Sequence, residues 1–250
     1  SIYRNKKIKF VEIGVANGGS LFMWRNYFGK KAEIIGIDLN PNAKKLEKYG
    51  FKIYIGSQSD KKFWNKLYKK EGKIDIILDD GGHKNLQQIS TVHYCLPFIK
   101  NGGKIVVEDT GTSFLKKEFN NPSKYSFINY SKNIIDIIHR RSPLLNKDLN
   151  YYSKKIFLIE YFESIVVFSI DTKKCFLNKE VNNKAKNEWA IDYRHNEYFK
   201  GIKGNLDKKY GLMSKRSFLR KLIRKIFYRN FLFNIFDNFK IKKIFKEMEK

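Results

Sequence analysis

Short apolar runs alternate with longer amphipathic stretches over about the first 110 residues of the chain. Runs that are apolar throughout are typical of strands buried on both faces, and apolar residues at every third or fourth position predict helices. The alternation predicts an α/β fold in which helices cover both sides of a parallel sheet. The predicted strands are 8–13, 33–37, 51–55, 74–78 and 104–107, and the predicted helices are 20–28, 42–49, 61–70 and 86–99.

Two further apolar runs, 156–161 and 164–170, are separated by only two residues. A gap this short predicts an antiparallel hairpin, because parallel strands need a much longer crossover connection. We therefore expect a mainly parallel, Rossmann-like sheet that ends in a C-terminal antiparallel hairpin, unlike the parallel sheet of dinucleotide-binding folds. Residues 113–154, which precede the hairpin, are polar, aromatic and irregular, with one predicted helix at 133–140.

The character of the chain changes after the hairpin. Residues 173–213 are polar and loop-like, whereas 215–250 carry 12 Lys or Arg and 3 Asp or Glu, with apolar residues at helical spacing between the basic ones. This spacing predicts a basic amphipathic helical extension. We therefore expect one domain over 1–171, with 113–154 inserted into it to build the acceptor pocket. A second region over 172–250 would combine a polar loop with the basic extension.

The composition is that of a globular protein with an excess of positive charge. Hydrophobic residues make up 42% of the chain, enough for a substantial core, and the net charge is +26. A charge of this size favours anionic partners, namely nucleic acid, a phospholipid surface or phosphorylated substrates. Cys95 and Cys175 form no disulfide or zinc pattern, which predicts an intracellular setting. No apolar run is long enough to cross a bilayer, and because the first strand starts soon after Ser1, we expect the natural N-terminus to lie further upstream.

Carboxylates follow two of the predicted strands at the points where the strands end. The fourth strand is followed by Asp79, Asp80 and His83, and the fifth by Glu108 and Asp109. Because the carboxyl ends of neighbouring parallel strands meet at one edge of an open sheet, we expect these side chains to lie close together. Carboxylates with a histidine suit a hard divalent cation and a general base. Each pair alone is more often a turn or a helix cap, so the prediction rests on their combination.

A glycine-rich turn links the first predicted strand to the first helix. Its glycines, Gly14, Gly18 and Gly19, are spaced differently from those of the dinucleotide-binding pattern. Asp38 ends the second strand, where a carboxylate can accept hydrogen bonds from ribose hydroxyls. The structural alternative is a tight turn and a helix-capping Asp38, but the two features together favour an adenosine ligand.

These motifs occur in the order and at the spacing of a known family. They are Glu12-Ile13-Gly14, Gly18-Gly19-Ser20-Leu21 with Met23-Trp24, Gly36-Ile37-Asp38, Gly56-Ser57-Gln58-Ser59-Asp60, Asp79-Asp80-Gly81-Gly82-His83 and Val107-Glu108-Asp109. Over about residues 8–115 the chain resembles the class I S-adenosylmethionine-dependent methyltransferases, and among them the metal-dependent sugar O-methyltransferases of macrolide tailoring, of the mycinamicin and macrocin type. It departs from their usual pattern at Gly82, where the family has serine, but no ligand is lost there.

The resemblance implies a reaction, two cofactors and a set of site residues. The reaction is transfer of a methyl group from S-adenosylmethionine to a sugar hydroxyl of a saccharide or glycosylated metabolite, assisted by Mg2+. Gly14 and its turn would hold the amino-acid end of the cofactor, Asp38 the ribose, and Gln58 with Ser57 the adenine side. The implied cofactor-binding residues are Glu12, Gly14, Asn17, Ser20, Asp38, Ser57, Gln58 and Asp79, the implied metal ligands are Asp80, Glu108 and Asp109, and the implied general base is His83.

The positive charge leaves a second function open, an RNA-binding protein or an RNA methyltransferase that uses the basic surface. A nicotinamide-dependent oxidoreductase is disfavoured by the glycine spacing and the hairpin. The basic extension has three possible roles. Packing against the domain or a second subunit is favoured, followed by binding to an anionic membrane surface and then by binding to nucleic acid. We therefore expect a cytoplasmic enzyme of saccharide tailoring or polysaccharide biosynthesis. Its basic extension could bind the inner membrane surface or mediate formation of a homo-oligomer.

Overall fold

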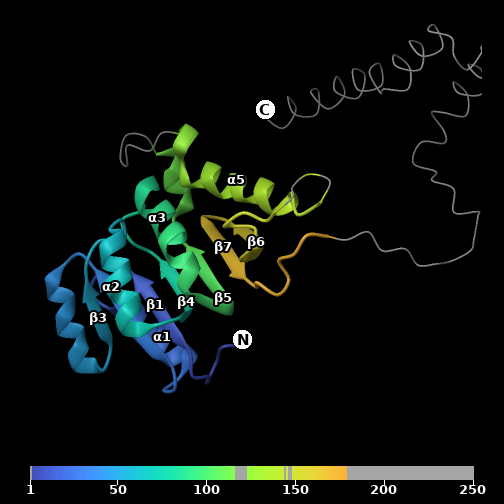
Figure 1. The fold of residues 1–250 in the computed structure, drawn as a ribbon. Helices are drawn as coiled ribbons and strands as arrows, with labels where there is room; N and C mark the ends of the chain where they lie inside the picture. Colours follow the sequence, from blue (N-terminus) through green and yellow to red (C-terminus); the bar gives the residue numbers. More distant parts are fainter. Residues whose placement is uncertain (1, 116–122, 144, 146–147, 179–250) are drawn as a thin grey trace, which may run out of the picture. The chain divides into compact units, whose positions relative to one another are not determined.

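The computed structural model describes residues 2–115, 123–143, 145 and 148–178 (Figure 1). The chain divides into two units, Ser1–Val181 and Asn182–Lys250, and the described residues lie in the first. The predicted basic helix at 215–250 lies outside the described residues, and the predicted boundary at residue 171 stays a prediction. No helix in the described part is long and apolar enough to span a membrane.

Seven strands form one mixed sheet in the order β3-β2-β1-β4-β5-β7-β6. Neighbours among β1 to β5 run parallel, whereas β7 runs antiparallel to both β5 and β6. This arrangement confirms the predicted parallel sheet with a C-terminal antiparallel hairpin. The strands are β1 (Lys9–Ile13), β2 (Glu33–Asp38), β3 (Lys52–Ile55), β4 (Ile74–Asp79), β5 (Ile99–Val107), β6 (Ile156–Phe162) and β7 (Ile165–Ile170).

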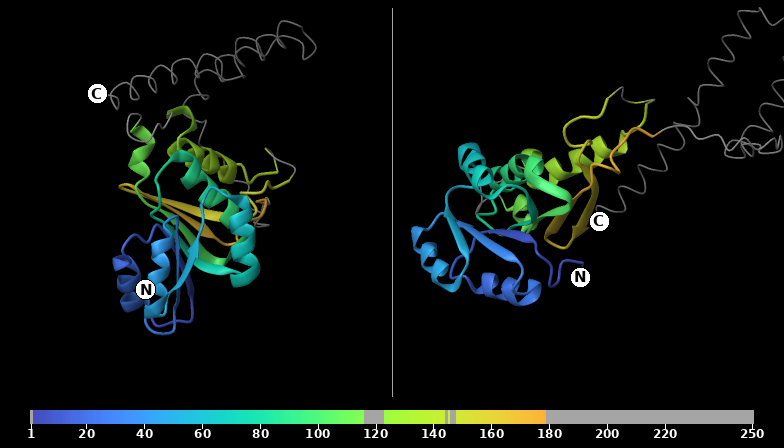
Figure 2. Two further views of the ribbon diagram at one scale, coloured as in Figure 1. Left: turned by 90° about the vertical axis from the view of Figure 1, so that its left-hand side faces the viewer. Right: turned by 60° about the horizontal axis from the view of Figure 1, so that its bottom comes forward.

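Helices cover both faces of this sheet (Figures 1 and 2). One face packs against α1 (Gly19–Phe28) and the 3₁₀-helix η1 (Pro41–Tyr49), and the other against α2 (Lys61–Glu71), α3 (Asn85–Cys95) and α5 (Phe127–His139). Successive residues of a strand point to opposite faces, so the central strands contribute side chains to both hydrophobic cores. The double cover explains why the parallel strands are apolar throughout.

The structure corrects the predicted end of α3. The helix stops at Cys95 instead of residue 99 and passes into the short 3₁₀-helix η2 (Leu96–Phe98), after which β5 begins. Pro97 has no backbone N–H to donate to the carbonyl of His93, four residues earlier, so the helical ladder is interrupted there. The Tyr151 hydroxyl donates to the His93 carbonyl instead (3.3 Å).

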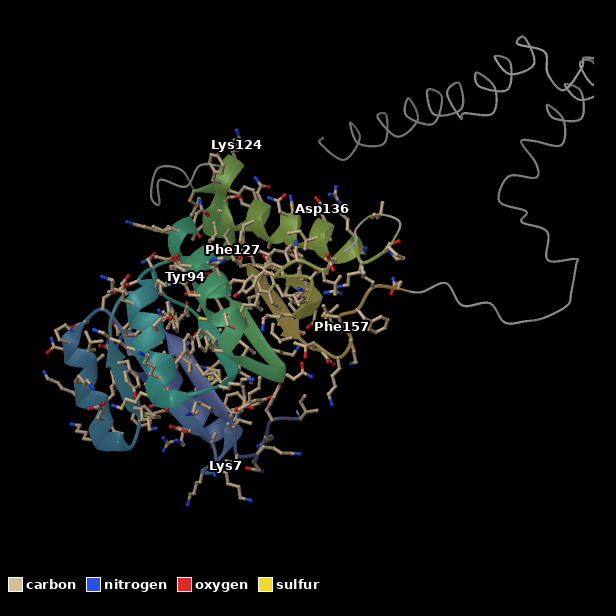
Figure 3. All side chains as sticks on the ribbon, viewed as in Figure 1. Lys7, Tyr94, Lys124, Phe127, Asp136 and Phe157 are labelled. Atoms are coloured by element: carbon tan, nitrogen blue, oxygen red, sulfur yellow. The ribbon has the colours of Figure 1, made fainter. Side chains whose placement is uncertain are left out.

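The helix predicted at 133–140 is also longer than expected, since α5 already starts at Phe127. Its first turn is capped by the Ser126 side chain, which accepts a hydrogen bond from the Asn129 backbone N–H (3.2 Å). Phe127, labelled in Figure 3, donates its backbone N–H to the side chain of Asn85 (2.8 Å) at the start of α3. The insertion before the hairpin is therefore anchored on the helix that follows β4.

Hydrogen bonds of the parallel ladder continue past the ends of the central strands. The backbone N–H of Asp80 donates to the carbonyl of Ile13 (3.0 Å), and that of Glu108 donates to the carbonyl of Asp79 (2.9 Å). These bonds place the segments that follow β1, β4 and β5 side by side at the carboxyl edge of the sheet. This is the edge where open α/β sheets bind their ligands.

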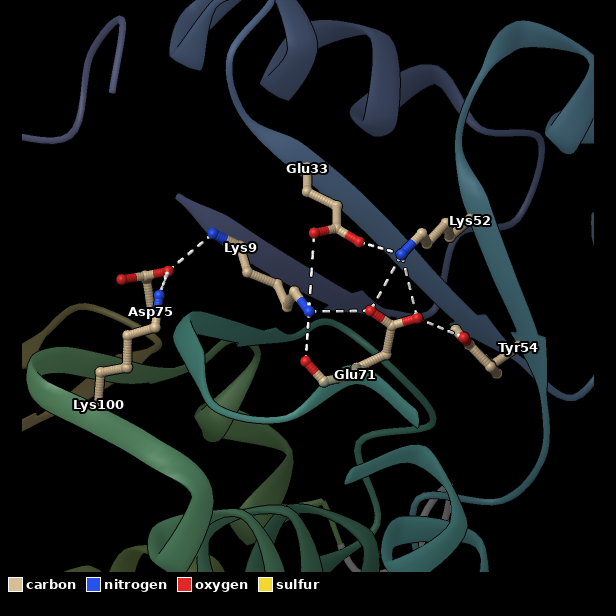
Figure 4. A network of polar contacts seen from close by, with 7 residues as sticks. All are labelled: Lys9, Glu33, Lys52, Tyr54, Glu71, Asp75 and Lys100. Atoms are coloured by element: carbon tan, nitrogen blue, oxygen red, sulfur yellow. Dashed lines mark hydrogen bonds and ion pairs between the residues drawn. The ribbon is translucent and has the colours of Figure 1, made fainter. Parts of the chain in front are cut away.

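A charged network joins the opposite, amino ends of the strands (Figure 4). The buried Glu71 carboxylate accepts hydrogen bonds from Lys9 (2.9 Å), from Lys52 (3.2 Å) and from the Tyr54 hydroxyl, and Glu33 pairs with both lysines. Burial by itself raises the pKa of Glu71, but the hydrogen bonds from Tyr54, Lys9 and Lys52 outweigh it and lower the pKa to about 2. The network ties the starts of β1, β2 and β3 to the end of α2.

Glu71→Gln should lower the free energy of unfolding at neutral pH by about 2 kcal/mol, because it removes a charged acceptor from three hydrogen bonds. The folded-state pKa lies below the ordinary 4.5, so this contribution is complete above about pH 5 and is lost as the pH falls toward 2. Urea denaturation at pH 7 measures the difference. Glu163→Gln, which alters an exposed acid in the hairpin turn, is the matched control, and equal stability of Glu71→Gln and wild type would contradict the assigned role of the network.

Candidate functional site

Three of the predicted site residues converge at the carboxyl edge. One ligating atom from each of Asp80, His83 and Asp109 lies within 4.8 Å of the other two. The His83 Nε2 atom is 3.6 Å from Asp109 Oδ2. Asp80 and His83 come from the loop after β4, and Asp109 comes from the turn after β5, so the structure brings together side chains from two adjacent strand ends, as the sequence predicts.

Glu108, the fourth residue predicted for this group, is outside the trio but interacts with it electrostatically. Burial raises the pKa of Glu108, the carboxylates of Asp80 and Asp109 raise it further, and His83 lowers it. Burial likewise raises the pKa of Asp80, with His83 opposing and Asp109 adding to the effect. In the described part of the chain, no lysine or arginine forms an ion pair with these carboxylates. The group therefore concentrates negative charge in the way that favours a divalent cation.

A cavity of about 430 Å³ opens beside this group. Its lining includes Asp80 and His83 as well as Gly14, Asp38 and Gln58 from the ends of the first three strands. The volume is within the range of pockets that bind small molecules. One cavity thus joins the glycine-rich turn to the acidic group.

The glycine-rich turn packs directly against the end of β4. Gly14 has a φ of +85°, and a Cβ atom at this position would lie 2.1 Å from the Asp80 carbonyl oxygen, so only glycine permits this approach. Oδ2 of Asp38 accepts hydrogen bonds from the backbone N–H groups of Val15 (3.0 Å) and Ala16 (3.1 Å), which fixes the turn against β2. Each carboxylate oxygen offers two acceptor positions, and Oδ1 also accepts the Asn40 backbone N–H (2.8 Å), so one position of Asp38 remains for a donor from a ligand.

Gln58 and Asp79 form a buried pair next to the cavity. The Gln58 Nε2 atom lies 2.9 Å and 2.8 Å from the two carboxylate oxygens of Asp79, and 3.1 Å from Thr91 Oγ1. Burial raises the pKa of Asp79, and the hydrogen bonds from Thr91 and Gln58 oppose this. In this structure Asp79 therefore connects the end of β4 to the segment after β3. A role for Gln58 or Asp79 in binding the cofactor stays a prediction.

Glu12 is a buried acid beside the acidic group, with only 1% of its surface exposed. Burial raises its pKa to about 7, hydrogen bonds from Ser20 and Trp24 oppose this effect, and the charges of Asp80 and Glu108 add to it. The Trp24 Nε1 atom donates to Glu12 Oε1 at 3.4 Å. Glu12 and Ser20, both predicted to bind the cofactor, thus interact with one another.

The remaining two residues predicted to bind the cofactor, Asn17 and Ser57, lie outside the lining of the cavity. Asn17 is exposed in the glycine-rich turn, and the Ser57 hydroxyl accepts a hydrogen bond from the Ser59 backbone N–H (3.2 Å). Their binding roles stay predictions.

Two buried polar residues that the sequence reasoning missed hold the backbone of the site. The Gln88 Nε2 atom donates to the carbonyl of Glu108 (2.9 Å), and the Thr112 hydroxyl lies against the carbonyls of His83 and Asp109. Gln88 could have been found from the sequence, because it is a polar residue at a helix position that is expected to face the core. Thr112 lies in a polar stretch, where nothing in the sequence distinguishes it from its neighbours.

Comparisons with known proteins confirm the family resemblance. No protein-family model matches the chain. Over 119 residues the chain is 30% identical to the mycinamicin VI 2''-O-methyltransferase of Micromonospora griseorubida, a match covering 45% of this chain and 29% of that protein. The chain is also 31% identical over 119 residues to the demethylmacrocin O-methyltransferase of Streptomyces fradiae, a match covering 45% of this chain and 30% of that protein.

A solved structure shows the same fold. The MycE methyltransferase from the mycinamycin biosynthetic pathway, in complex with Mg, SAH and mycinamycin VI, matches with a TM-score of 0.64 at 22% identity, covering 74% of this chain and 50% of that chain. The predicted class I methyltransferase fold is thereby confirmed. The matched segment spans only about 30% of the length of the curated relatives named above.

Glu12→Gln should make the ligand-free protein more stable than wild type at pH 8 and equally stable near pH 4.5. The folded-state pKa of about 7 lies above the ordinary 4.5, so the stability contributed by protonated Glu12 is lost as the pH rises through this window. The full difference is about 3 kcal/mol. Urea denaturation at both pH values without added metal measures it, with Asp136→Asn, an exposed acid on α5, as control. An unchanged difference between pH 4.5 and 8 would refute the assignment.

Proposed function

We propose that this protein is an S-adenosylmethionine-dependent O-methyltransferase that acts on a sugar hydroxyl with the help of Mg2+. One observation carries the proposal: the acidic group of Asp80, Glu108 and Asp109, together with His83, lies beside a cavity that also reaches Gly14. The fold and the sequence similarity to sugar O-methyltransferases support this assignment.

The cavity has features that suit S-adenosylmethionine. The Asp38 carboxylate keeps one acceptor position for a ribose hydroxyl, although it already accepts three backbone N–H groups. Gly14 lets the backbone come close to the amino-acid end of the cofactor. The buried Glu12 carboxyl, with a pKa of about 7, gains a negative charge readily when a positive group such as the cofactor's ammonium lies nearby.

The acidic group has the donor chemistry that Mg2+ prefers. Asp80, Glu108 and Asp109 supply hard carboxylate oxygens. Burial raises the pKa values of Asp80 and Glu108, the neighbouring carboxylates add to this, and a bound cation would favour the charged forms. When bound, S-adenosylmethionine supplies an electrophilic methyl group, and Mg2+ supplies positive charge that lowers the pKa of a nearby sugar hydroxyl.

His83 is the residue proposed to remove the proton from the acceptor hydroxyl. His83 lines the cavity, and its Nε2 atom lies 3.6 Å from Asp109 Oδ2, so the carboxylate can orient the imidazole. The imidazole would take the hydroxyl proton as the hydroxyl oxygen bonds to the methyl carbon, and the bond between that carbon and the cofactor's sulfur would break to release S-adenosylhomocysteine. His83 also lies close enough to Asp80 and Asp109 to bind the same metal ion. The His83 variants described below distinguish a general base from a metal ligand.

The acceptor is proposed to be a saccharide or a glycosylated metabolite. Curated relatives are named as O-methyltransferases of mycinamicin VI, of demethylmacrocin and of a tetracenomycin that carries a rhamnosyl group. The sequence predicts that the segment 113–154 builds the acceptor pocket. The helix α5 within this segment is anchored on the start of α3 by the hydrogen bond from the Phe127 backbone N–H to Asn85 (2.8 Å).

Calorimetry tests the cofactor and the metal without knowledge of the acceptor. S-adenosylhomocysteine should bind with micromolar affinity, and a separate Mg2+ titration should give a binding heat that Asp80→Asn removes. Asp80→Asn should change the S-adenosylhomocysteine affinity by less than about threefold. The substitution keeps the hydrogen bond from the backbone N–H of residue 80 to the Ile13 carbonyl, which holds the loop after β4 against β1. Asp136→Asn is the matched control. Folded protein that binds no S-adenosylhomocysteine would refute the proposed function.

His83→Ala should reduce methyl transfer to glycosylated acceptors by roughly a hundredfold, the usual contribution of a general base, while Mg2+ affinity stays the same. Radiolabelled methyl transfer and calorimetry measure the two quantities. His83→Asn is a second variant, because asparagine tolerates the left-handed backbone found here (φ 54°) and separates loss of the imidazole from loss of the loop conformation. Loss of Mg2+ affinity in both variants would instead make His83 a metal ligand.

A further inference from the structure

The buried side chain of Thr112 links the loop after β4 to the turn after β5. Thr112 belongs to the 3₁₀-helix η3 (Thr110–Phe114), and its hydroxyl oxygen lies 2.9 Å from the carbonyl oxygen of His83 and 2.8 Å from that of Asp109. The hydroxyl shares its one proton between these two acceptors. The contact therefore couples the positions of two residues that belong to the candidate metal and base site.

Both residues that Thr112 contacts have an unusual backbone conformation. His83 has a φ of 54° and Asp109 a φ of 52°, in the left-handed region that residues other than glycine rarely adopt. Such a conformation is unfavourable for residues with a Cβ atom and persists only where surrounding contacts maintain it. A hydroxyl that bonds the carbonyls of both residues is a contact of this kind.

The contact lies between the two halves of the ligand set. Asp80 and His83 stand on the β4 side, and Asp109 stands on the β5 side. The Asp109 carbonyl also accepts the Thr112 backbone N–H (3.1 Å), so the turn after β5 keeps its own closure without the hydroxyl. Loss of the hydroxyl therefore removes the link across to the β4 side and leaves the separation between the two sets of ligands less defined.

We propose that Thr112 is a positioning residue that sets the separation of Asp80 and His83 from Asp109 and thereby tunes metal affinity. The inference rests on the proposed function, because it assumes that these side chains hold a divalent cation. Ligands from two segments bind a cation tightly only when the segments are held at the correct distance, and partners that orient ligands typically contribute 10- to 100-fold to metal affinity.

The test compares three variants of the full chain, with Mn2+ as a spectroscopic stand-in for Mg2+. Thr112→Val, which replaces the hydroxyl with a methyl group of similar shape, should weaken Mn2+ binding measured by electron paramagnetic resonance at least tenfold. Thr112→Ser, which keeps the hydroxyl, should retain the wild-type affinity. Thr110→Val is the matched control, because Thr110 is buried in the same helix and its side chain makes no hydrogen bond to the described residues.

Two further measurements separate positioning from a general loss of structure. Binding of S-adenosylhomocysteine should be unchanged in all three variants, and hydrogen exchange of metal-free protein should be faster over residues 81–85 in Thr112→Val alone. Thr112→Val that binds Mn2+ as wild type does, or Thr112→Ser that is as weak as Thr112→Val, would overturn the inference. Wild-type protein that binds no Mn2+ would refute the proposed metal site, and unchanged exchange in Thr112→Val would then overturn the positioning role as well.

Discussion

The site depends on two backbone hydrogen bonds that extend the parallel ladder beyond the strands themselves, from Asp80 to Ile13 and from Glu108 to Asp79. They align the segments after β1, β4 and β5 at one edge of the sheet. The glycine-rich turn then meets the loop after β4 so closely that a Cβ atom on Gly14 would collide with the Asp80 carbonyl. A displacement of β1, β4 or β5 would separate the cavity from the acidic group, because the residues of the site come from the segments that follow these strands.

The pKa values of buried acids are shifted in opposite directions at the two edges of the sheet. At the amino edge, Glu71 accepts hydrogen bonds from two lysines and a tyrosine, which lower its pKa to about 2 despite its burial. At the carboxyl edge, burial and mutual repulsion raise the pKa values of Glu12, Asp80 and Glu108. The amino edge is thus internally neutralised and stabilises the fold. At the carboxyl edge, no lysine or arginine of the described residues pairs with the carboxylates, and a bound cation would favour their charged forms.

Around the acidic group, neutral polar side chains hold the backbone without adding charge. Gln88 bonds the Glu108 carbonyl, Thr112 bonds the carbonyls of His83 and Asp109, and Gln58 holds the buried Asp79. A lysine or arginine in any of these positions would neutralise the carboxylates and compete with a metal ion. Amide and hydroxyl donors fix the same geometry and leave the negative charge in place.

Sequence alone determined the parallel sheet, its antiparallel hairpin and the strand ends that carry Asp80, His83, Glu108 and Asp109, because these follow from local apolar runs and from the rule that parallel strands share a carboxyl edge. It misplaced the end of α3 and the start of α5, where Pro97 and the Ser126 cap overrode the apolar periodicity. Only the tertiary structure showed that Gln58 bonds to Asp79, that Glu12 is buried beside the acidic group and that Thr112 links the two site loops. These contacts join residues from 21 to 29 positions apart or depend on the packing of several strands, and no local pattern records which side chains will meet.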